Sequence, residues 1–166
     1  MIAHVSNSMP FTIRFDDASV ARGVGPGSIS GVILFEFGLH QFPAPNWRDF
    51  PFPILGWWLS ACEKLTSGGA ERQSLMFMDG PFEIEIEPIS DVSVELRCID
   101  RGQPESLRFF SVVRFEDLFE QIAKTASAVE DICASKGWAD IVGYKDFVDR
   151  LRRKLANMQY KLPPIA

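Results

Sequence analysis

Residues 73–100 read QSLMFMDGPFEIEIEPISDVSVELRCID, and they carry the clearest structural signal in the chain. The pair Asp79-Gly80 separates two segments rich in strand-forming residues, 73–78 and 81–87. An Asp-Gly pair in this setting is the strongest short-range signal for a β-hairpin, because glycine accepts the positive φ that a tight turn needs. The sequence therefore predicts a hairpin with a two-residue turn at Asp79-Gly80.

Alternation of apolar and polar residues extends this hairpin into a meander. In its second arm, isoleucines and glutamates take alternate positions. The next strand repeats the pattern, with four residues expected to face inward: Val92, Val94, Leu96 and Cys98. A further strand over 107–113 completes the meander. We expect one face of this antiparallel sheet to pack on helices and the other to be at least partly exposed to water.

Two more strands precede the meander. Alternation predicts the first strand over 11–15, followed by a glycine-rich loop that runs to about residue 28. The segment 29–37 is apolar on both faces, which predicts a strand in the centre of the sheet. Prolines after it predict an irregular loop over 41–48.

Apolar residues at three- and four-residue spacing predict three helices. The first covers residues 50–66, with Asp49 as its N-cap and Gly68-Gly69 at its end. The second begins at Phe115 and ends at 136–138, and the third begins at about residue 141 or 143 and ends at 158. This order predicts an α+β fold in which an antiparallel meander of about five or six strands packs against about three helices.

Length and composition limit the class of protein. A chain of 166 residues is expected to form one domain over 1–166. Its net charge of −5 argues against nucleic acid as the main partner, because binding to phosphates needs a basic face. No apolar run predicts a membrane span, and no secretory signal is evident. Three widely spaced cysteines are typical of a reducing compartment, so we expect a cytoplasmic protein whose oligomeric state stays open.

No residue pattern predicts catalysis, a metal or a cofactor. His4 and His40 lack partners at the spacing of a structural zinc site. The cysteines lie at inward-facing positions typical of small core residues. The glycines between residues 23 and 31 precede a strand, whereas a phosphate-binding loop follows one and opens a helix. We therefore expect a protein that is not an enzyme.

Aromatic residues gather around the first predicted helix: Phe42, Trp47, Phe50, Phe52, Trp57 and Trp58. The simplest interpretation is a packed edge of the hydrophobic core. The alternative is a ligand pocket or a contact surface around Trp47 and Trp57, because tryptophan is enriched among the residues that dominate binding energy.

An acidic stripe follows the polar face of the meander and comprises Glu83, Glu85, Glu87, Asp91 and Glu95. A solvated sheet face that resists edge-to-edge pairing would explain it. The alternative is a surface that attracts a basic protein partner, since complementary charge accelerates and directs association.

Three segments resemble a group of small bacterial proteins: 42–50, which includes Phe42-Pro43 and NWRDF, LGWWL at 55–59, and FMDGPF at 77–82. The resemblance covers residues 40–90. Some members of that group resemble the immunity proteins carried beside polymorphic or contact-dependent toxins. The resemblance implies a binding protein without catalytic residues, and it assigns no functional residue.

The leading hypothesis is an immunity-type inhibitor that neutralises a toxin domain through an acidic surface. The residues expected to bind the partner are Glu83, Glu85, Glu87, Glu95, Trp47 and Asp49. One alternative is a small-ligand-binding protein or enzyme that uses an aromatic pocket around Trp47 and Trp57. Another alternative is a structural or regulatory module, whose acidic face only keeps the protein in solution.

Overall fold

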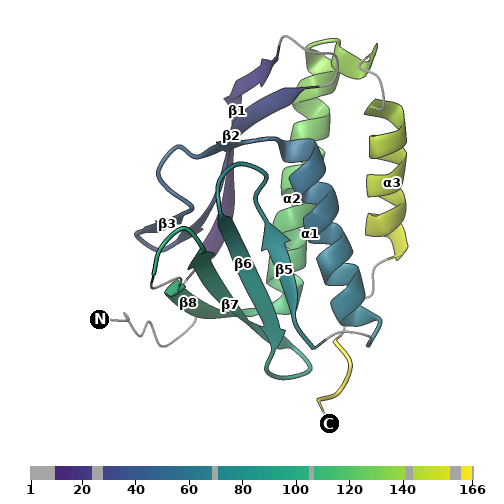
Figure 1. Cartoon of the computed structure of the whole chain (residues 1–166). Helices are drawn as coiled ribbons and strands as arrows, with labels where there is room; N and C mark the ends of the chain where they lie inside the picture. Colours follow the sequence, from purple (N-terminus) through teal and green to yellow (C-terminus); the bar gives the residue numbers. More distant parts are fainter. Residues whose placement is uncertain are drawn as a thin grey trace.

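Two antiparallel sheets and three α-helices form the described part of the chain, residues 10–23, 28–68, 71–104, 107–140, 144–157 and 162–165 of a computed structural model (Figure 1). The first sheet is built around β2, which pairs with each of the other three strands. Its strands are β1 (Phe11–Arg22), β2 (Ile29–Phe37), β3 (His40–Phe42) and β4 (Arg48–Asp49). The prediction of a central strand over 29–37 is confirmed.

The second sheet is the predicted meander, in the order β5-β6-β7-β8. Its strands are β5 (Gln73–Met76), β6 (Phe82–Pro88), β7 (Ser93–Asp100) and β8 (Leu107–Arg114). The α+β class and the meander are confirmed, whereas the prediction of one sheet of five or six strands is wrong. β2 finds its partners within residues 11–49, partly in segments predicted to be loops, so the two groups of strands form separate sheets.

The three helices are α1 (Pro51–Thr66), α2 (Phe115–Ser135) and α3 (Tyr144–Asn157), and a 3₁₀ turn covers Trp138–Asp140. α1 packs against β5, α2 and α3, while α2 packs against β1. α3 lies on the side of α1 and α2 that faces away from the sheets (Figure 1). Phe50 rather than Asp49 is the N-cap residue of α1, because Asp49 belongs to β4.

Aromatic side chains join the two sheets inside the core. The buried ring of Trp58 in α1 contacts Phe35 of the first sheet at 5.1 Å between ring centroids and Phe77 beside the second sheet at 5.5 Å. Phe37 and Phe109 meet edge to face across the sheets at 5.0 Å. The core interpretation of the aromatic residues is therefore correct for Trp58, whose Nε1 also donates a 2.8 Å hydrogen bond to the carbonyl of Met76.

Three local predictions need correction. Gly80 has the predicted positive φ of 73°, but the turn has four residues, 78–81, because the N–H of Phe77 still pairs with the carbonyl of Phe82. β1 continues to Arg22 through an irregularity after Asp16, so part of the predicted glycine-rich loop is strand. Val92 is 50% exposed because it precedes β7. Several predicted features lie outside the described residues: His4, 24–27, Gly69, 141–143 and 158.

Candidate functional site

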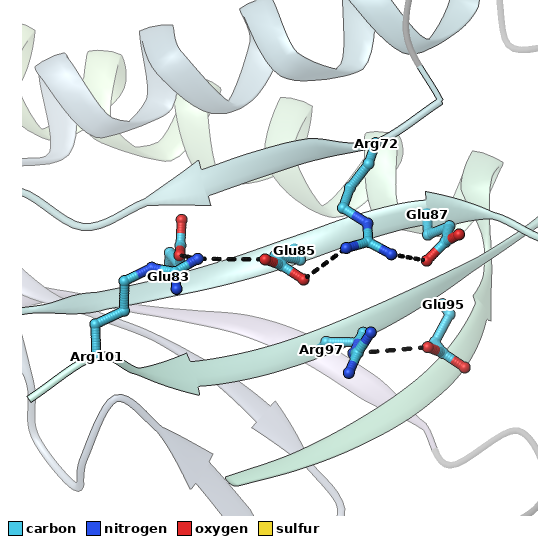
Figure 2. Close-up of polar contacts among 7 residues, drawn as sticks. All are labelled: Arg72, Glu83, Glu85, Glu87, Glu95, Arg97 and Arg101. Atoms are coloured by element: carbon cyan, nitrogen blue, oxygen red, sulfur yellow. Dashed lines mark hydrogen bonds and ion pairs between the residues drawn. The ribbon is translucent and has the colours of Figure 1, made fainter. Parts of the chain in front are cut away.

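The four glutamates of the predicted acidic stripe lie on the outer face of the second sheet (Figure 2). Asp91, which was predicted to belong to the stripe, lies instead in the exposed turn between β6 and β7. In the antiparallel register, Glu85 lies opposite Arg97 and Glu87 opposite Glu95. Directly opposed residues point to the same side of a sheet. Their neighbours along the strands, such as Ile84 and Ile86, point into the core and are fully buried. The alternation in the sequence therefore places these glutamates correctly on one face.

Arginines accompany the glutamates on this face. Arg72 reaches Glu87 with a 2.7 Å hydrogen bond and lies 3.6 Å from Glu85. The hydrogen bond from Arg72 to Glu87, followed by the negative charges of Glu87 and Glu85, raises the pKa of Arg72 above its ordinary value. The glutamates therefore stabilise the charged form of this guanidinium.

Two further arginines complete the network. Arg101, in the turn after β7, forms ion pairs with Glu83 and, at 3.3 Å, with Glu85. Arg97 lies 3.9 Å from Glu95 (Figure 2). Four carboxylates thus face three guanidinium groups. We call this set the carboxylate–arginine face: Arg72, Glu83, Glu85, Glu87, Glu95, Arg97 and Arg101. The face is a network of opposite charges rather than the uniformly acidic surface that the sequence predicts.

Exposure divides the carboxylate–arginine face into an inner and an outer part. The side chain of Glu83 is 8% exposed, whereas those of Glu87 and Glu95 are 39% and 29% exposed. Apolar side chains flank them on the same side of the sheet, with Met76 opposite Glu83 and Val112 opposite Glu95. Both are exposed. The accessible surface therefore combines charged groups with apolar ones, as the rims and centres of protein interfaces do.

Asp49, which was predicted to bind the partner, lies inside the protein and not on its surface. Its residue surface is 1% exposed, and its carboxylate accepts hydrogen bonds from backbone N–H groups of Phe50, Met78 and Asp79. Trp47 donates to the same carboxylate through Nε1 at 3.2 Å. Asp49 thus holds the β5–β6 turn, and no part of its side chain is offered to a partner.

Trp47 supports the same turn. Its half-buried ring meets Phe82 edge to face at 5.0 Å between centroids. The hollows beside Trp57 are lined by residues of α1, α3 and β5 and by Arg72, which precedes β5, and they do not include Trp47. Within the described residues, therefore, the structure does not bring Trp47 and Trp57 together in one of these hollows.

Trp57 is the exposed member of the tryptophan pair in α1, with 43% of its surface accessible. One hollow of about 250 Å³ lies between α1 and α3, and another of about 500 Å³ lies between α1 and β5. Both are lined in part by Trp57 and Ser60. This is the second surface of the molecule that has the form of a binding site.

Metal-ligating side chains and reactive thiols were the remaining candidates for chemistry in the described part of the chain. No group of three His, Cys, Asp or Glu side chains there could hold a metal ion. Cys62, Cys98 and Cys133 are buried, and burial raises the pKa of the Cys62 thiol to about 12, so it stays protonated and unreactive at neutral pH. None of the helices described is long and apolar enough to cross a membrane.

No family model matches the chain, and neither a curated protein nor a solved structure shows significant similarity to it. The resemblance to immunity proteins therefore stays a prediction. Any functional assignment must be argued from the residues of this chain and their geometry.

The arginines of the carboxylate–arginine face were not among the predicted site residues. Alternation along the strand does predict that Arg97 faces outward with Glu95, and the register places it opposite Glu85. Arg72 and Arg101 lie outside the strands, in segments where no periodicity indicates the direction of a side chain. Their contacts with the glutamates depend on the course of the loops that carry them.

Proposed function

We propose that the chain is a binding protein without catalytic activity, an immunity-type inhibitor that neutralises a toxin domain in the cytoplasm. The partner docks on the carboxylate–arginine face. The observation that supports this most is the combination of half-exposed Glu87 and Glu95 with the exposed apolar side chains of Met76 and Val112. Apolar contacts of this kind supply affinity, while the charged groups select the partner.

The ion pairs within the carboxylate–arginine face change which partners this face would attract. A uniformly acidic face would attract any basic domain over long distances, with a strong dependence on salt. Here Arg72 and Arg101 already neutralise much of the glutamate charge. A partner must therefore present both cations and carboxylates at matching positions. We expect selectivity for one toxin rather than a general affinity for basic proteins.

The first test is co-expression with a toxin domain encoded directly beside this gene. We expect the cells to survive and the two proteins to purify together as a complex. Unchanged toxicity together with the absence of a complex would overturn the proposal. Turnover of a small substrate would instead favour the alternative of an enzyme.

A charge exchange tests the surface itself. Arg72→Glu combined with Glu87→Arg keeps an ion pair on the sheet but reverses both charges that face a partner. The exchange also replaces the contact of Arg72 with Glu85 by a repulsive one, so we expect a small fall of the urea midpoint rather than unfolding, since exposed ion pairs contribute roughly 0–1 kcal/mol. Protection and complex formation should be lost.

The matched control exchanges Arg14 and Glu36, a similarly exposed pair at 3.5 Å on the first sheet. This control variant should still protect the cells. If both exchanges protect equally, the carboxylate–arginine face is not the docking surface, and its charges serve the fold alone, as the structural-module alternative expects.

A further inference from the structure

A second surface adjoins the carboxylate–arginine face and is centred on Trp57. Trp58, its neighbour in α1, is fully buried, whereas Trp57 leaves 43% of its surface accessible. Successive residues of a helix point about 100° apart, so one ring enters the core and the other points outward. Tryptophan is the residue type most enriched where a few side chains dominate a binding energy.

The shape around Trp57 is elongated. The hollow on one side, of about 250 Å³, is lined by Phe52 and Gly56 of α1 and by Arg150 and Lys154 of α3, among others. The hollow on the other side, of about 500 Å³, is lined by Lys64 of α1 and by residues at β5. The two adjoin at Trp57 and Ser60. We call both together the Trp57 trough.

Positive charge lies at both ends of the Trp57 trough. α3 carries five basic and two acidic residues, although the whole chain has a net charge of −5. Lys154 lies 3.6 Å from Glu63. Within the described residues, Arg150 and Lys64 form no ion pair with a carboxylate, so these two cations are available to an anionic partner.

The chemistry of an occupant follows from this arrangement. An apolar side chain packs favourably against Trp57, beside Phe52 on one side or Met76 on the other. Carboxylates on either side of that anchor would meet Arg150 and Lys64. A compact organic anion would fill one of the two hollows and leave the cation at the other end without a partner. An extended chain can reach both.

We propose that the Trp57 trough binds an acidic peptide segment of a protein partner, with one large apolar side chain anchored against Trp57. This goes beyond the proposed function, because it assigns a surface that does not include the glutamates of the carboxylate–arginine face. Acidic segments are recognised in this manner by clusters of basic side chains. The trough thus gives the molecule a second site, one that prefers an anionic partner, whereas the carboxylate–arginine face requires a partner with both kinds of charge.

The experiment selects peptides from a random library displayed on phage, using the whole immobilised chain. We expect the enriched peptides to be acidic and to contain an aromatic or large aliphatic residue. Fluorescein-labelled copies of them are then titrated by fluorescence anisotropy. Trp57→Ala should weaken their binding by about tenfold or more, as the loss of a dominant side chain does. Arg150→Glu and Lys64→Glu should each weaken it as well.

Matched controls separate binding from folding. Leu39→Ala removes an apolar side chain that is 98% exposed and does not line the trough, and Lys124→Glu reverses an exposed charge on α2. Both should leave peptide binding unchanged. Urea midpoints of all variants are measured in parallel, and because each substituted side chain is exposed, we expect them to stay close together. None of these variants alters Arg72, which belongs to the carboxylate–arginine face and also lines the trough. Met76, which flanks that face and lines the trough, is likewise unchanged.

Two results would overturn the proposal. One is a selection that yields no acidic peptides, or yields peptides whose affinity is the same for Trp57→Ala. The other is binding of anilinonaphthalene sulfonate that Trp57→Ala abolishes while no peptide binds. This second result would identify the trough as a site for a small organic anion.

Discussion

At the scale of the residue, Asp49 is the clearest case of one side chain holding several segments. Its carboxylate accepts hydrogen bonds from the backbone N–H groups of Phe50, Met78 and Asp79 and from the indole of Trp47. A carboxylate that accepts several N–H donors forms charge-assisted bonds, which are stronger than neutral ones. The buried position of Asp49 is explained by these donors.

Asp49→Ala should therefore destabilise the protein strongly. The substitution leaves buried N–H groups without an acceptor, and we expect the free energy of unfolding to fall by about 3 kcal/mol or more. Asp49→Asn keeps one oxygen acceptor, so it should lose less. Urea denaturation measures both, with Asp91→Ala in an exposed turn as the control. Equal stability of all variants would contradict the role of Asp49 in the turn.

The adjacent pair Trp57 and Trp58 offers a second comparison. Trp58 is fully buried and bonds to the carbonyl of Met76, so Trp58→Ala should cost roughly 3–5 kcal/mol of unfolding free energy. Trp57→Ala, one position earlier and on the exposed side of α1, should change it far less. Urea titrations of both variants, followed by circular dichroism, measure these two changes in the free energy of unfolding. A similar loss for the two variants would mean that Trp57 is also part of the core.

At the scale of the element, two glycines have the same backbone conformation but different surroundings. Substituting each of them therefore distinguishes the effect of backbone strain from that of a steric clash. Gly80, in the β5–β6 turn, and Gly137, after α2, have φ values of 73° and 71°. A Cβ at Gly80 would approach the ring of Phe82 to 2.8 Å, whereas a Cβ at Gly137 would have no neighbour within 4 Å.

Gly137→Ala should lower the free energy of unfolding by about 1 kcal/mol, because alanine is strained at positive φ. Gly80→Ala should lower it by that amount and further, because the new Cβ must also displace a packed ring. We expect Gly80→Ala to be the less stable variant by about 1 kcal/mol or more. Thermal and urea unfolding of the two variants measure the difference. If Gly137→Ala were the more destabilising, the tight contact at Gly80 would be refuted.

The elements with the strongest local sequence signals were predicted well. β2 and α1 match their predicted ranges to within one residue, because the apolar run over 32–35 in β2 and the regular apolar stripe of α1 specify them locally. The division into two sheets could not be predicted. It depends on β3 and β4, strands of three and two residues that are too short to show any period.

The glutamates of the candidate site were predicted from the sequence, but its arginines were not, and the predicted Trp47 and Asp49 lie at the β5–β6 turn instead. Alternation placed Glu83, Glu85 and Glu87 on one face, since the strand period is local. The charge balance of that face depends on Arg72 and Arg101, which reach it from loops. The Trp57 trough is formed by α1, α3 and β5, segments distant in sequence, and only the packing of α3 shows that Arg150 faces α1.

At the scale of the whole molecule, the three buried cysteines report on global unfolding. They lie in α1, β7 and α2, so each belongs to a different packed element. Burial raises the pKa of Cys62 from 9.0 to about 12 and that of Cys133 to about 11, and it raises the pKa of Cys98 too. Folding therefore favours the protonated thiols.

The sign of the pH dependence follows from these shifts. Below pH 9 the thiols are protonated in both states, whereas above it the unfolded chain loses protons that the folded chain retains. The thiol contribution to stability should thus decrease as pH rises from about 9 toward 12. The unfolding free energy of Cys62→Ala should decline less steeply with pH than that of the unchanged chain. Equal slopes would show that Cys62 ionises in the folded protein.

The contact of Asp49 with the β5–β6 turn also affects the order of folding. Its bonds to Met78 and Asp79 join positions 29 and 30 residues apart, and the whole of α1 lies between them. Closing a loop of this length lowers the entropy of the chain, and this loss is offset only once the hydrogen bonds have formed. We infer that the turn reaches its final geometry late, after α1 has docked. Loss of the carboxylate should then leave the folding rate nearly unchanged and accelerate unfolding, so Asp49 sets the lifetime of the folded chain.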